Sequence, residues 1–413
     1  MIALEEMGLR AKEAARVLAQ AGAVKETALL AVAAALREHR EELLNANAQD
    51  MANGQRAEMT ASLLDRLRLT EDRIEGMAKG VEAVATASDP IGKVLFGETR
   101  PNGLRIEKVA VPLGVVGIIY EARPNVTSDC AALCLKAGST VILRGGKEAM
   151  TSNQATVKVI RQALESAGLP ADCVQLVEDT SRESATRLMG MTEYLDVLIP
   201  RGGAGLIRSV KENAKVPVIE TGVGNCHVFV DESADLAMAA EIVFNAKTSR
   251  PSVCNAIETV LVHEKIAKKA LPLLAARLAE KNVELRGCER TRKILPQAKA
   301  ATEEDWATEY LDYILAVKVV DSLDEALGHI RRYSTGHSEC IVTESYANAQ
   351  RFLNEVDAAA VYVNASTRFT DGGEFGLGAE IGISTQKLHA RGPMGLEQLT
   401  SHKYLIRGTG QIR

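Results

Sequence analysis

The chain has 413 residues, 46% of them hydrophobic and 25% charged, so it is long enough for two or three domains and has an ordinary globular composition. A net charge of -5 argues against a nucleic-acid-binding protein. Seven cysteines without a CxxC pair argue against disulfides and structural zinc, and the charged first 20 residues and the lack of a long apolar run predict a cytoplasmic protein that does not bind membranes.

The first 80 residues are expected to be helical, because Leu29, Val32, Ala33 and Leu36 recur at helical spacing. Residues 104–107 then alternate between apolar and charged, and residues 109–119 continue as an extended segment interrupted by proline and glycine. This pattern predicts a projecting ribbon or a sheet edge.

From residue 141 onward, short apolar runs alternate with helical stretches. The expected strands are 141–143, 174–177, 196–199, 228–230, 259–262, 316–320 and 361–363, and the expected helices include 150–167, 236–246 and 266–280. This is the pattern of βαβ units, so we expect two α/β domains with parallel sheets. The glycine-rich residues 371–382 are expected to form a loop near a functional cleft.

Cys254 is a candidate nucleophile in the polar segment RPSVCNAIET, which precedes an apolar run. A thiol on a loop can react if its pKa is lowered, for which Arg250 and nearby backbone amides are candidates. A single cysteine is more often a small buried apolar residue. Its role therefore depends on the rest of the sequence.

Several other segments place polar groups or glycines at strand ends. Glu220 lies 34 residues before Cys254, and Asn125 follows Pro124 after an apolar run. Arg201, Gly202 and Gly203 follow another apolar run and precede a helical stretch. Glycines there let backbone N–H groups approach a pyrophosphate at a helix N-terminus, although the sequence is not GxGxxG and is a weak signal alone.

Taken together, these segments resemble the aldehyde dehydrogenase superfamily from about Pro112 to the C-terminus. The resemblance implies that Cys254 attacks the substrate carbonyl and that Glu220 is the general base. It also implies that the Asn125 amide and the Cys254 backbone N–H stabilise the oxyanion. The ordinary alternatives are a turn-capping carboxylate for Glu220 and a turn residue for Asn125.

The same resemblance implies a nucleotide cofactor, whose binding residues would be Arg144, Gly145, Gly146, Lys147, Arg201, Gly202, Gly203 and Glu374. Lys147 stands where NAD-dependent members often have an acidic residue. Two cations, Arg144 and Lys147, suit a 2′-phosphate better than a diol, so NADPH is the implied cofactor. The alternative is that both are ordinary solvated residues.

Residues 320–341 resemble most specifically the gamma-glutamyl phosphate reductase branch of the superfamily. The resemblance implies reduction of L-glutamyl 5-phosphate by NADPH through a thioester on Cys254, giving L-glutamate 5-semialdehyde and phosphate in proline biosynthesis. His329 and His337 lie in this segment around a Ser-Thr-Gly turn, which favours a loop over a metal site. No metal is expected.

The implied fold is α/β and aldehyde dehydrogenase-like, with a Rossmann-type cofactor domain, an α/β catalytic domain and a small oligomerisation ribbon. The expected boundaries are 1–102 and 113–225 for the cofactor domain, with about 365–395 as a further candidate part, 226–364 for the catalytic domain, and 103–112 with 396–413 for the ribbon. We expect a homodimer or homotetramer and a handover of substrate from glutamate 5-kinase. Candidate residues for the substrate's amino and carboxylate groups, chosen by charge and placement, are Arg123, Arg250, Ser366, Thr367 and Arg368.

Three other functions are compatible with parts of this pattern. In a hydrolytic NAD(P)-dependent aldehyde dehydrogenase, Glu220 would activate water, and the activity would not depend on phosphate. A non-catalytic α/β binding protein would have no enzymatic activity, so an activity that thiol alkylation abolishes would argue against this function. A cysteine hydrolase would not require NADPH.

Overall fold

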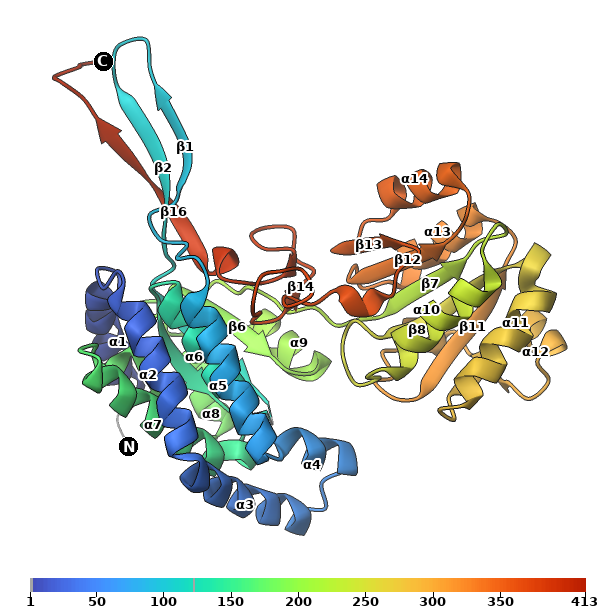
Figure 1. Ribbon diagram of the computed structural model, residues 1–413, viewed down its shortest axis with the longest axis horizontal. Coiled ribbons are helices and arrows are strands. Elements are labelled where there is room, and N and C mark those ends of the chain that lie inside the picture. Colours follow the sequence, from blue (N-terminus) through green and yellow to red (C-terminus); the bar gives the residue numbers. More distant parts are fainter. Residues whose placement is uncertain (1–2, 122) are drawn as a thin grey trace. The chain divides into compact units, whose positions relative to one another are not determined.

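The computed structural model describes residues 3–121 and 123–413. The chain folds into two compact units, and each contains its own parallel β-sheet (Figure 1). Unit 1 consists of Met1–Thr221, Gly376–Gly382 and Met394–Arg413, and unit 2 consists of Gly222–Phe375 and Ile383–Pro393. The prediction of an α/β fold with parallel sheets is confirmed.

Helices form the first part of unit 1, as the periodicity of the sequence predicted. They are α1 (Leu4–Leu18), α2 (Val24–Glu38), α3 (Arg40–Arg56), α4 (Ala61–Leu67) and α5 (Glu71–Thr86). In α2, Leu29, Val32 and Leu36 are buried, whereas Leu30 is 42% exposed. The apolar side of this helix therefore faces the core.

The sheet of unit 1 has the strand order β5-β4-β3-β6, and all its strand pairs are parallel. The strands are β3 (Val115–Tyr120), β4 (Thr140–Arg144), β5 (Val174–Leu176) and β6 (Val197–Arg201), and the helices that connect or follow them are α6 (Pro124–Lys136), α7 (Met150–Ser166), α8 (Arg182–Met189) and α9 (Ala204–Asn213). All six residues of β3 are buried, as expected for a strand inside a parallel sheet. Arg144 at the end of β4 lies beside Ile119, and Arg201 at the end of β6 lies beside Tyr120. Because parallel strands end at the same edge of a sheet, both arginines lie at one edge.

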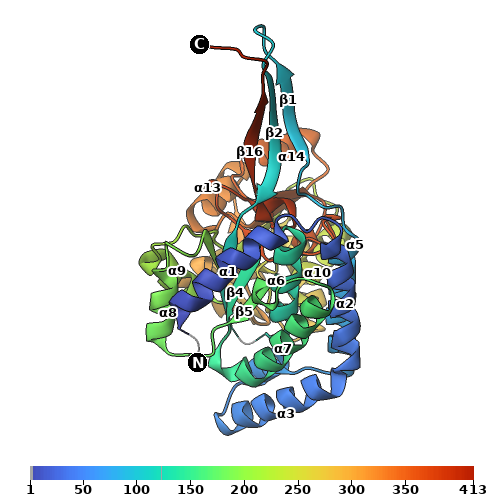
Figure 2. The same cartoon turned by 90° about the vertical axis from the view of Figure 1, so that its left-hand side faces the viewer.

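An antiparallel ribbon extends from the helices of unit 1 (Figures 1 and 2). It consists of β1 (Val94–Thr99), β2 (Arg105–Pro112) and β16 (Thr400–Arg407), in the order β1-β2-β16. The extended segment predicted over residues 104–119 is divided between two strands: β2 belongs to the ribbon, whereas β3 is an inner strand of the parallel sheet, so the ribbon prediction is wrong for residues 115–119. The partner of β2, β16, comes from the other end of the chain. The ribbon also includes β1, which lies within residues 1–102, the range predicted for the cofactor domain.

Unit 2 has the strand order β10-β9-β11-β8-β7-β12-β13 with parallel pairing throughout. The strands are β7 (Cys226–Val230), β8 (Ile257–His263), β9 (Glu284–Gly287), β10 (Lys299–Ala300), β11 (Ile314–Val320), β12 (Ser338–Val342) and β13 (Ala360–Val363), with the helices α10 (Leu236–Thr248), α11 (Glu264–Ala279), α12 (Glu289–Ile294), α13 (Leu323–Tyr333) and α14 (Tyr346–Glu355). Short elements complete the two units: η1 (Lys147–Ala149), η2 (Ala171–Cys173), η3 (Glu304–Ala307), η4 (Thr367–Phe369), η5 (Glu397–Leu399), β14 (Ile383–Ser384) and β15 (Gly392–Pro393).

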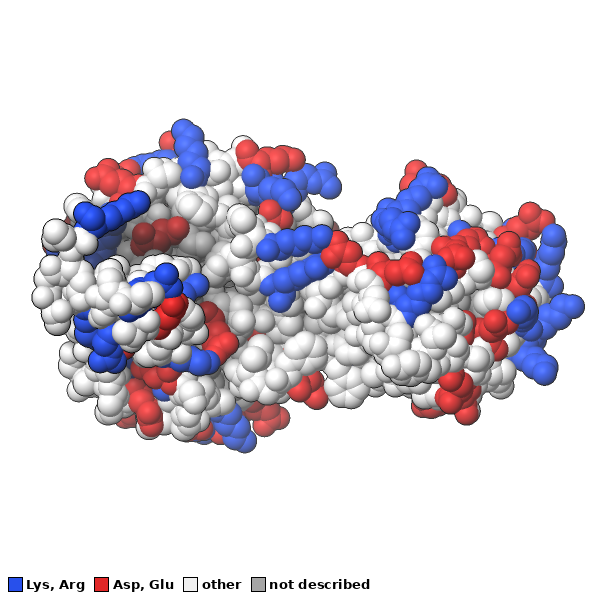
Figure 3. Space-filling view, turned by 90° about the horizontal axis from the view of Figure 1, so that it is seen from above, with Lys and Arg blue, Asp and Glu red and all other residues white. Residues whose placement is uncertain are grey.

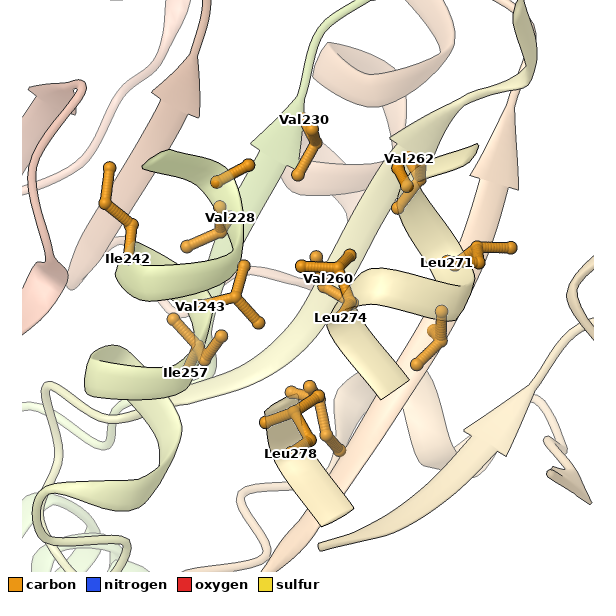
Figure 4. Packing of buried hydrophobic residues seen from close by; sticks show 14 of the residues in the cluster. Val228, Val230, Ile242, Val243, Ile257, Val260, Val262, Leu271, Leu274 and Leu278 are labelled. Carbon is orange, nitrogen blue, oxygen red and sulfur yellow. The ribbon is translucent and has the colours of Figure 1, made fainter. Parts of the chain in front are cut away.

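The core of unit 2 lies where α10 and α11 cover β7 and β8 (Figure 4). Val243 of α10 and Leu274 of α11 point toward Val228 and Val260 of the sheet, and all four side chains are buried. This packing holds the end of α10 and the start of β8 in place. The chain between them carries Cys254.

The prediction of a loop around the Ser-Thr-Gly turn is only partly correct. Residues 334–337 form no helix or strand, but Ser338–Val342 is the buried strand β12, which pairs with β7 and β13. This strand was not predicted, because its sequence SECIV contains two polar residues. The Glu339 carboxylate is buried and accepts hydrogen bonds from the backbone N–H of His227 and from the hydroxyl of Ser334.

The surface carries charges of both signs. On the face shown in Figure 3, Lys and Arg side chains are interspersed with Asp and Glu side chains. Within residues 3–121 and 123–413, no helix combines the length and apolar character needed to cross a membrane.

Candidate active site

Cys254 lies in a turn between α10 and β8, and its side chain is partly exposed. The carbonyl oxygen of Cys254 accepts a hydrogen bond of 3.2 Å from the Cys226 thiol. The backbone of Gly224 packs directly on the Cys254 peptide, since a methyl group on Gly224 would lie 2.7 Å from the Cys254 Cα and closer to its carbonyl atoms. Gly224 is therefore needed for the position of the thiol-bearing residue.

Asn255 connects the Cys254 turn to the segment around η4. Its side-chain Nδ2 donates to the carbonyl oxygens of Thr370 (2.9 Å) and Arg368 (3.3 Å), and the Thr367 hydroxyl donates to the Asn255 carbonyl (2.7 Å). Asn255 is buried. These bonds hold the residue after the thiol and thereby restrict the turn.

A buried ion pair closes the base of the same turn. The ammonium of Lys247, near the end of α10, lies 2.6 Å from the carboxylate of Glu258, at the start of β8, and both side chains are 0% exposed. The second oxygen of Glu258 accepts from the backbone N–H of Leu311 (3.2 Å). Burial raises the pKa of Glu258 above its usual range, and the charge of Lys247 opposes this shift.

The guanidinium of Arg368 interacts electrostatically with the Cys254 thiol and with the guanidinium of Arg250. Arg368 is half-buried, and it donates to Ser249 Oγ (3.0 Å) and to the Asn255 side-chain oxygen. Burial lowers the pKa of Arg368, and the like charge of Arg250 lowers it further. Cations in such partly dehydrated surroundings gain from binding an anion.

The hydroxyls of Ser366 and Thr367 both take part in the local structure. Ser366 Oγ caps η4 by accepting from the Arg368 N–H (3.3 Å), and Thr367 is fully buried and donates to the Asn255 carbonyl. The Thr367 proton is thus used locally, whereas the Ser366 hydroxyl only accepts in this contact.

Asn125 is the second residue of α6, which begins with Pro124 at its first position, where a missing N–H is tolerated. The side chain of Asn125 is exposed, and its Nδ2 donates to Asp129 Oδ2 (2.9 Å). Asp129 was not among the predicted site residues, although its position four residues after Asn125 on a helix indicates that the two side chains are neighbours. Arg123, also a substrate candidate, is the residue that precedes α6.

Glu220 follows the bridge between Val218 and Leu198 in unit 1. Its carboxylate is 23% exposed, and it lies 3.2 Å from the ammonium of Lys211. Glu220 and Asn125 thus belong to unit 1, whereas Cys254 belongs to unit 2.

Arg144 ends β4, and its Nη2 donates to the carbonyls of Thr180 (2.8 Å) and Ser181 (3.0 Å). Its Nε is buried and has no hydrogen-bond partner within the part of the chain that the structure describes. Burial lowers the pKa of Arg144, while the charges of Asp179 and Glu148 oppose this shift. The guanidinium is therefore held in place through two of its five N–H bonds, both on Nη2.

The residues next to Arg144 have different surroundings. Lys147 is exposed in η1. A side chain at Gly145 would collide with the amide of Asn153, and one at Gly146 would collide with the carboxylate of Glu148. Gly145 is therefore needed for close packing, whereas the Glu148 side chain could move away from a methyl group on Gly146.

The glycine turn after β6 leads directly into α9, as predicted. Gly203 is the N-cap residue of α9 and has no side chain to cap the helix. Its N–H donates to Glu121 Oε2 (2.9 Å), and a methyl group on Gly202 would lie 2.6 Å from the Glu121 carboxyl carbon. A carboxylate thus lies where the turn and the helix N-terminus favour a negative charge. Glu121 was not among the predicted site residues.

Glu374 lies in unit 2 on an exposed turn. Its backbone N–H donates to Asp371 Oδ1 (3.4 Å), and its charge acts on Arg368. The structure thus places Glu374 near the guanidinium groups of unit 2.

The two histidines of the segment 320–341 are packing residues. His329 lies in α13 and His337 directly before β12, and both are buried. Burial lowers the pKa of His337 to about 4 and that of His329 further, so both are neutral at physiological pH. Among the described residues, no group of three or more His, Cys, Asp or Glu side chains is arranged to hold a metal ion.

The chain is similar to several known proteins. Residues 4–305 match the model of the aldehyde dehydrogenase family. The chain is 64% identical to the gamma-glutamyl phosphate reductase of Moorella thermoacetica, over 99% of this chain and 98% of the relative, and 58% identical to that of Caldanaerobacter subterraneus subsp. tengcongensis, over 99% of each.

Solved structures agree with these relatives. The crystal structure of gamma-glutamyl phosphate reductase from Thermotoga maritima is similar with a TM-score of 0.97 and 52% identity, covering 99% of both chains. An acetylating aldehyde dehydrogenase from Geobacillus thermoglucosidasius, at 19% identity, has a TM-score of 0.71 and covers 99% of this chain and 97% of its own. The second similarity concerns the fold alone.

Proposed function

This chain belongs to the aldehyde dehydrogenase family, and we propose that it reduces L-glutamyl 5-phosphate to L-glutamate 5-semialdehyde and phosphate with NADPH, in proline biosynthesis. Its relatives named gamma-glutamyl phosphate reductase support this specificity. The structural observation that carries the proposal is a partly exposed thiol, Cys254, on a restricted turn beside the cations Arg250 and Arg368. A substrate with carboxylate and phosphate groups suits such surroundings.

In the proposed reaction, the Cys254 thiolate attacks the carbonyl carbon of the acyl phosphate. The C–S bond forms and the C–O bond to phosphate breaks, so that inorganic phosphate leaves and a thioester remains. NADPH, when bound, supplies the hydride that reduces the thioester. Collapse of the resulting tetrahedral oxyanion breaks the C–S bond, releases the aldehyde and returns the Cys254 thiolate, and the one proton that the reaction consumes is taken up from solvent by the departing phosphate. Asn125 and the Cys254 backbone N–H would stabilise the negative oxygen in both addition steps, each contributing about 3 kcal/mol.

The cofactor would be held by unit 1. Its pyrophosphate would bind at the turn of Arg201, Gly202 and Gly203 and the N-terminus of α9, where the Gly203 N–H now donates to a carboxylate. The family uses NAD or NADP, and we propose NADPH because Arg144 and Lys147 supply two cations at the end of β4. Gly145 and Gly146 would allow close approach of the ribose, and Glu374 would contact the nicotinamide ribose.

Neutralising the two cations tests the cofactor preference. Arg144→Gln with Lys147→Gln is expected to raise the KM for NADPH far more than the KM for NADH, because contacts to a phosphate are charge-assisted. Titration of cofactor fluorescence would measure the binding independently of turnover. Equal effects on both cofactors would contradict a 2′-phosphate site.

The substrate's carboxylate is proposed to bind Arg368 and Arg250, with Arg123 as a further candidate from unit 1. Arg368 is the strongest of these because it is partly buried and positioned by Ser249 and Asn255. Ser366 and Thr367, whose hydroxyls already have structural partners, would act through the shape of η4. We also propose a cytoplasmic homodimer or homotetramer that associates through the ribbon, and substrate handover from glutamate 5-kinase.

The decisive assay is oxidation of glutamate 5-semialdehyde by NADP, measured with and without phosphate. The wild type is expected to require phosphate, and Cys254→Ser is expected to lose at least nine tenths of the rate while remaining folded, because a hydroxyl is a poor nucleophile at neutral pH. Cys288→Ser is the matched control, since Cys288 is the other partly exposed thiol among the described residues. A Cys254→Ser variant that keeps more than a tenth of the rate would contradict the assignment.

Glu220 separates the proposal from a hydrolytic aldehyde dehydrogenase. A hydrolytic enzyme needs a general base to activate water, and losing that base costs about 10²- to 10⁴-fold in rate. A phosphate dianion needs no such base, so Glu220→Gln is expected to keep most of the phosphate-dependent activity. Rapid oxidation without phosphate in the wild type, lost in Glu220→Gln, would favour the hydrolytic function.

A further inference from the structure

The Asn125 amide, which the proposed function assigns to the oxyanion, lies exposed at the start of α6. An exposed asparagine side chain can rotate, and a flip exchanges its oxygen acceptor with its NH₂ donor group. Stabilisation of an oxyanion depends on a donor that is oriented before the reaction. A neighbouring group is therefore needed to hold the amide.

Asp129 is such a group. It lies one helical turn after Asn125 on the same side of α6, and its Oδ2 accepts a hydrogen bond of 2.9 Å from Asn125 Nδ2. An ionised carboxyl group only accepts hydrogen bonds, so it selects the orientation in which the NH₂ group faces it. The Ser128 hydroxyl also donates to the Asn125 carbonyl (2.9 Å), which holds the first turn of the helix.

The amide retains a second N–H for a ligand. An NH₂ group has two N–H bonds, and Asp129 is the acceptor that the described residues provide for one of them. Fixing the first N–H also fixes the direction of the second, because the amide is planar. The pair is therefore suited to presenting one N–H in a constant direction.

Asp129 is partly buried, and it makes no direct ion pair with residues 3–121 or 123–413. α5 approaches it with Gly80, where an added methyl group would contact Asp129 Oδ1 at 3.8 Å. Burial raises the pKa of Asp129 to about 6, and the Asn125 hydrogen bond, the charge of Arg201 at the end of β6 and the Ser128 hydrogen bond oppose this shift. The other titratable group that interacts with it is the thiol of Cys130. The carboxylate is thus ionised at neutral pH and able to accept from Asn125.

We propose that Asp129 is a positioning residue that orients the Asn125 amide toward the oxyanion formed on the substrate carbonyl. The proposal rests on the proposed function, because it requires the oxyanion role of Asn125. A carboxylate in partly buried surroundings is unfavourable for folding, and orientation of the amide is the benefit that the geometry offers in return.

The test is a double-mutant cycle with Asn125→Ala, Asp129→Leu and the combined variant. Loss of an oxyanion donor is expected to lower kcat about 10²- to 10³-fold in Asn125→Ala. Asp129→Leu is expected to lower kcat about tenfold with little change in KM, because the amide then has to be ordered during the reaction. Asp129→Asn, whose side-chain oxygen can still accept from Asn125, is expected to keep most of the rate. The combined variant should be no slower than Asn125→Ala alone, because Asp129 acts through Asn125.

Cys134→Ala is the matched control, since it alters a buried thiol of the same helix whose pKa is affected by burial and not by Asp129. Thermal unfolding of every variant separates loss of folding from loss of orientation. If Asn125→Ala is inactive but Asp129→Leu is not slowed, or if the two effects multiply in the combined variant, the positioning role is refuted and the proposed function stands. If Asn125→Ala keeps the full rate, the oxyanion role fails and the positioning role fails with it.

Discussion

Substituting Gly224 by alanine is expected to displace the nucleophile without altering any group that reacts. The new methyl carbon would lie 2.7 Å from the Cys254 Cα, whereas non-bonded carbon atoms prefer about 3.5–4.0 Å. The Cys254 carbonyl oxygen would lie closer still, at 1.5 Å, so one of the two backbones has to move by about 1.5–2 Å. The φ angle of Gly224 is outside the left-handed region, so this penalty is steric and not conformational.

A displacement of that size in a reacting group can cost about 10²-fold in rate. We therefore expect kcat/KM for phosphate-dependent semialdehyde oxidation to fall about 100-fold in Gly224→Ala, with a loss of stability of about 1–3 kcal/mol from overpacking. The rate of Cys254 alkylation by iodoacetamide should change as well, because the Cys254 turn is displaced. Activity and alkylation are measured under conditions in which urea unfolding shows the variant to be folded.

Gly222→Ala is the matched control in the same segment. Its methyl group would meet the side chain of Thr385, which can rotate away, and not a backbone. We expect this variant to lose less than tenfold in kcat/KM. If Gly224→Ala keeps more than a third of the wild-type value and its alkylation rate is unchanged, the contact between Gly224 and Cys254 does not position the thiol.

Three further predictions concern charged side chains. Lys247→Met is expected to destabilise the protein by about 3–5 kcal/mol in urea unfolding, because it leaves the Glu258 carboxylate buried without its partner, and a loss below 1 kcal/mol would contradict this. Glu121→Gln is expected to lower the Kd for NADPH several-fold in a fluorescence titration, since the wild-type carboxylate competes with phosphate for the Gly203 N–H; an unchanged Kd would show that the two do not compete. The pKa of Asp129 is raised by folding to about 6, so its contribution to stability is complete below about pH 4 and is lost as the pH rises through 6. The wild type should therefore lose urea resistance relative to Asp129→Asn between pH 4 and 7, and parallel curves for the two proteins would disprove the shift.

Local patterns were sufficient for most elements of the fold. The helical spacing in α2 and the apolar runs of β3 and β8 correspond to buried faces, so their type could be predicted from neighbouring residues alone. β12 was missed because its burial depends on Glu339 finding partners in β7 and after α13. No local pattern contains that information.

The same distinction between local sequence patterns and tertiary contacts applies to the proposed site. The sequence contains the turn with Cys254 and the strand ends with Arg144 and Arg201, and resemblance to a family suggested their roles. The hydroxyls of Ser366 and Thr367 were equally plausible ligands for the substrate until the structure showed their partners. The charge and size of a side chain do not reveal whether its polar atoms are already satisfied.

The sequence by itself determined the type of most secondary-structure elements and, through its motifs, which cysteine to select. Only the tertiary structure decided that Glu121 caps the glycine turn, 82 residues away along the chain, and that Gly224 lies against the Cys254 peptide. The physical reason is that helix and strand periodicity arise from interactions between near neighbours, whereas these contacts depend on the order of parallel strands and on which strand ends meet at one edge of a sheet.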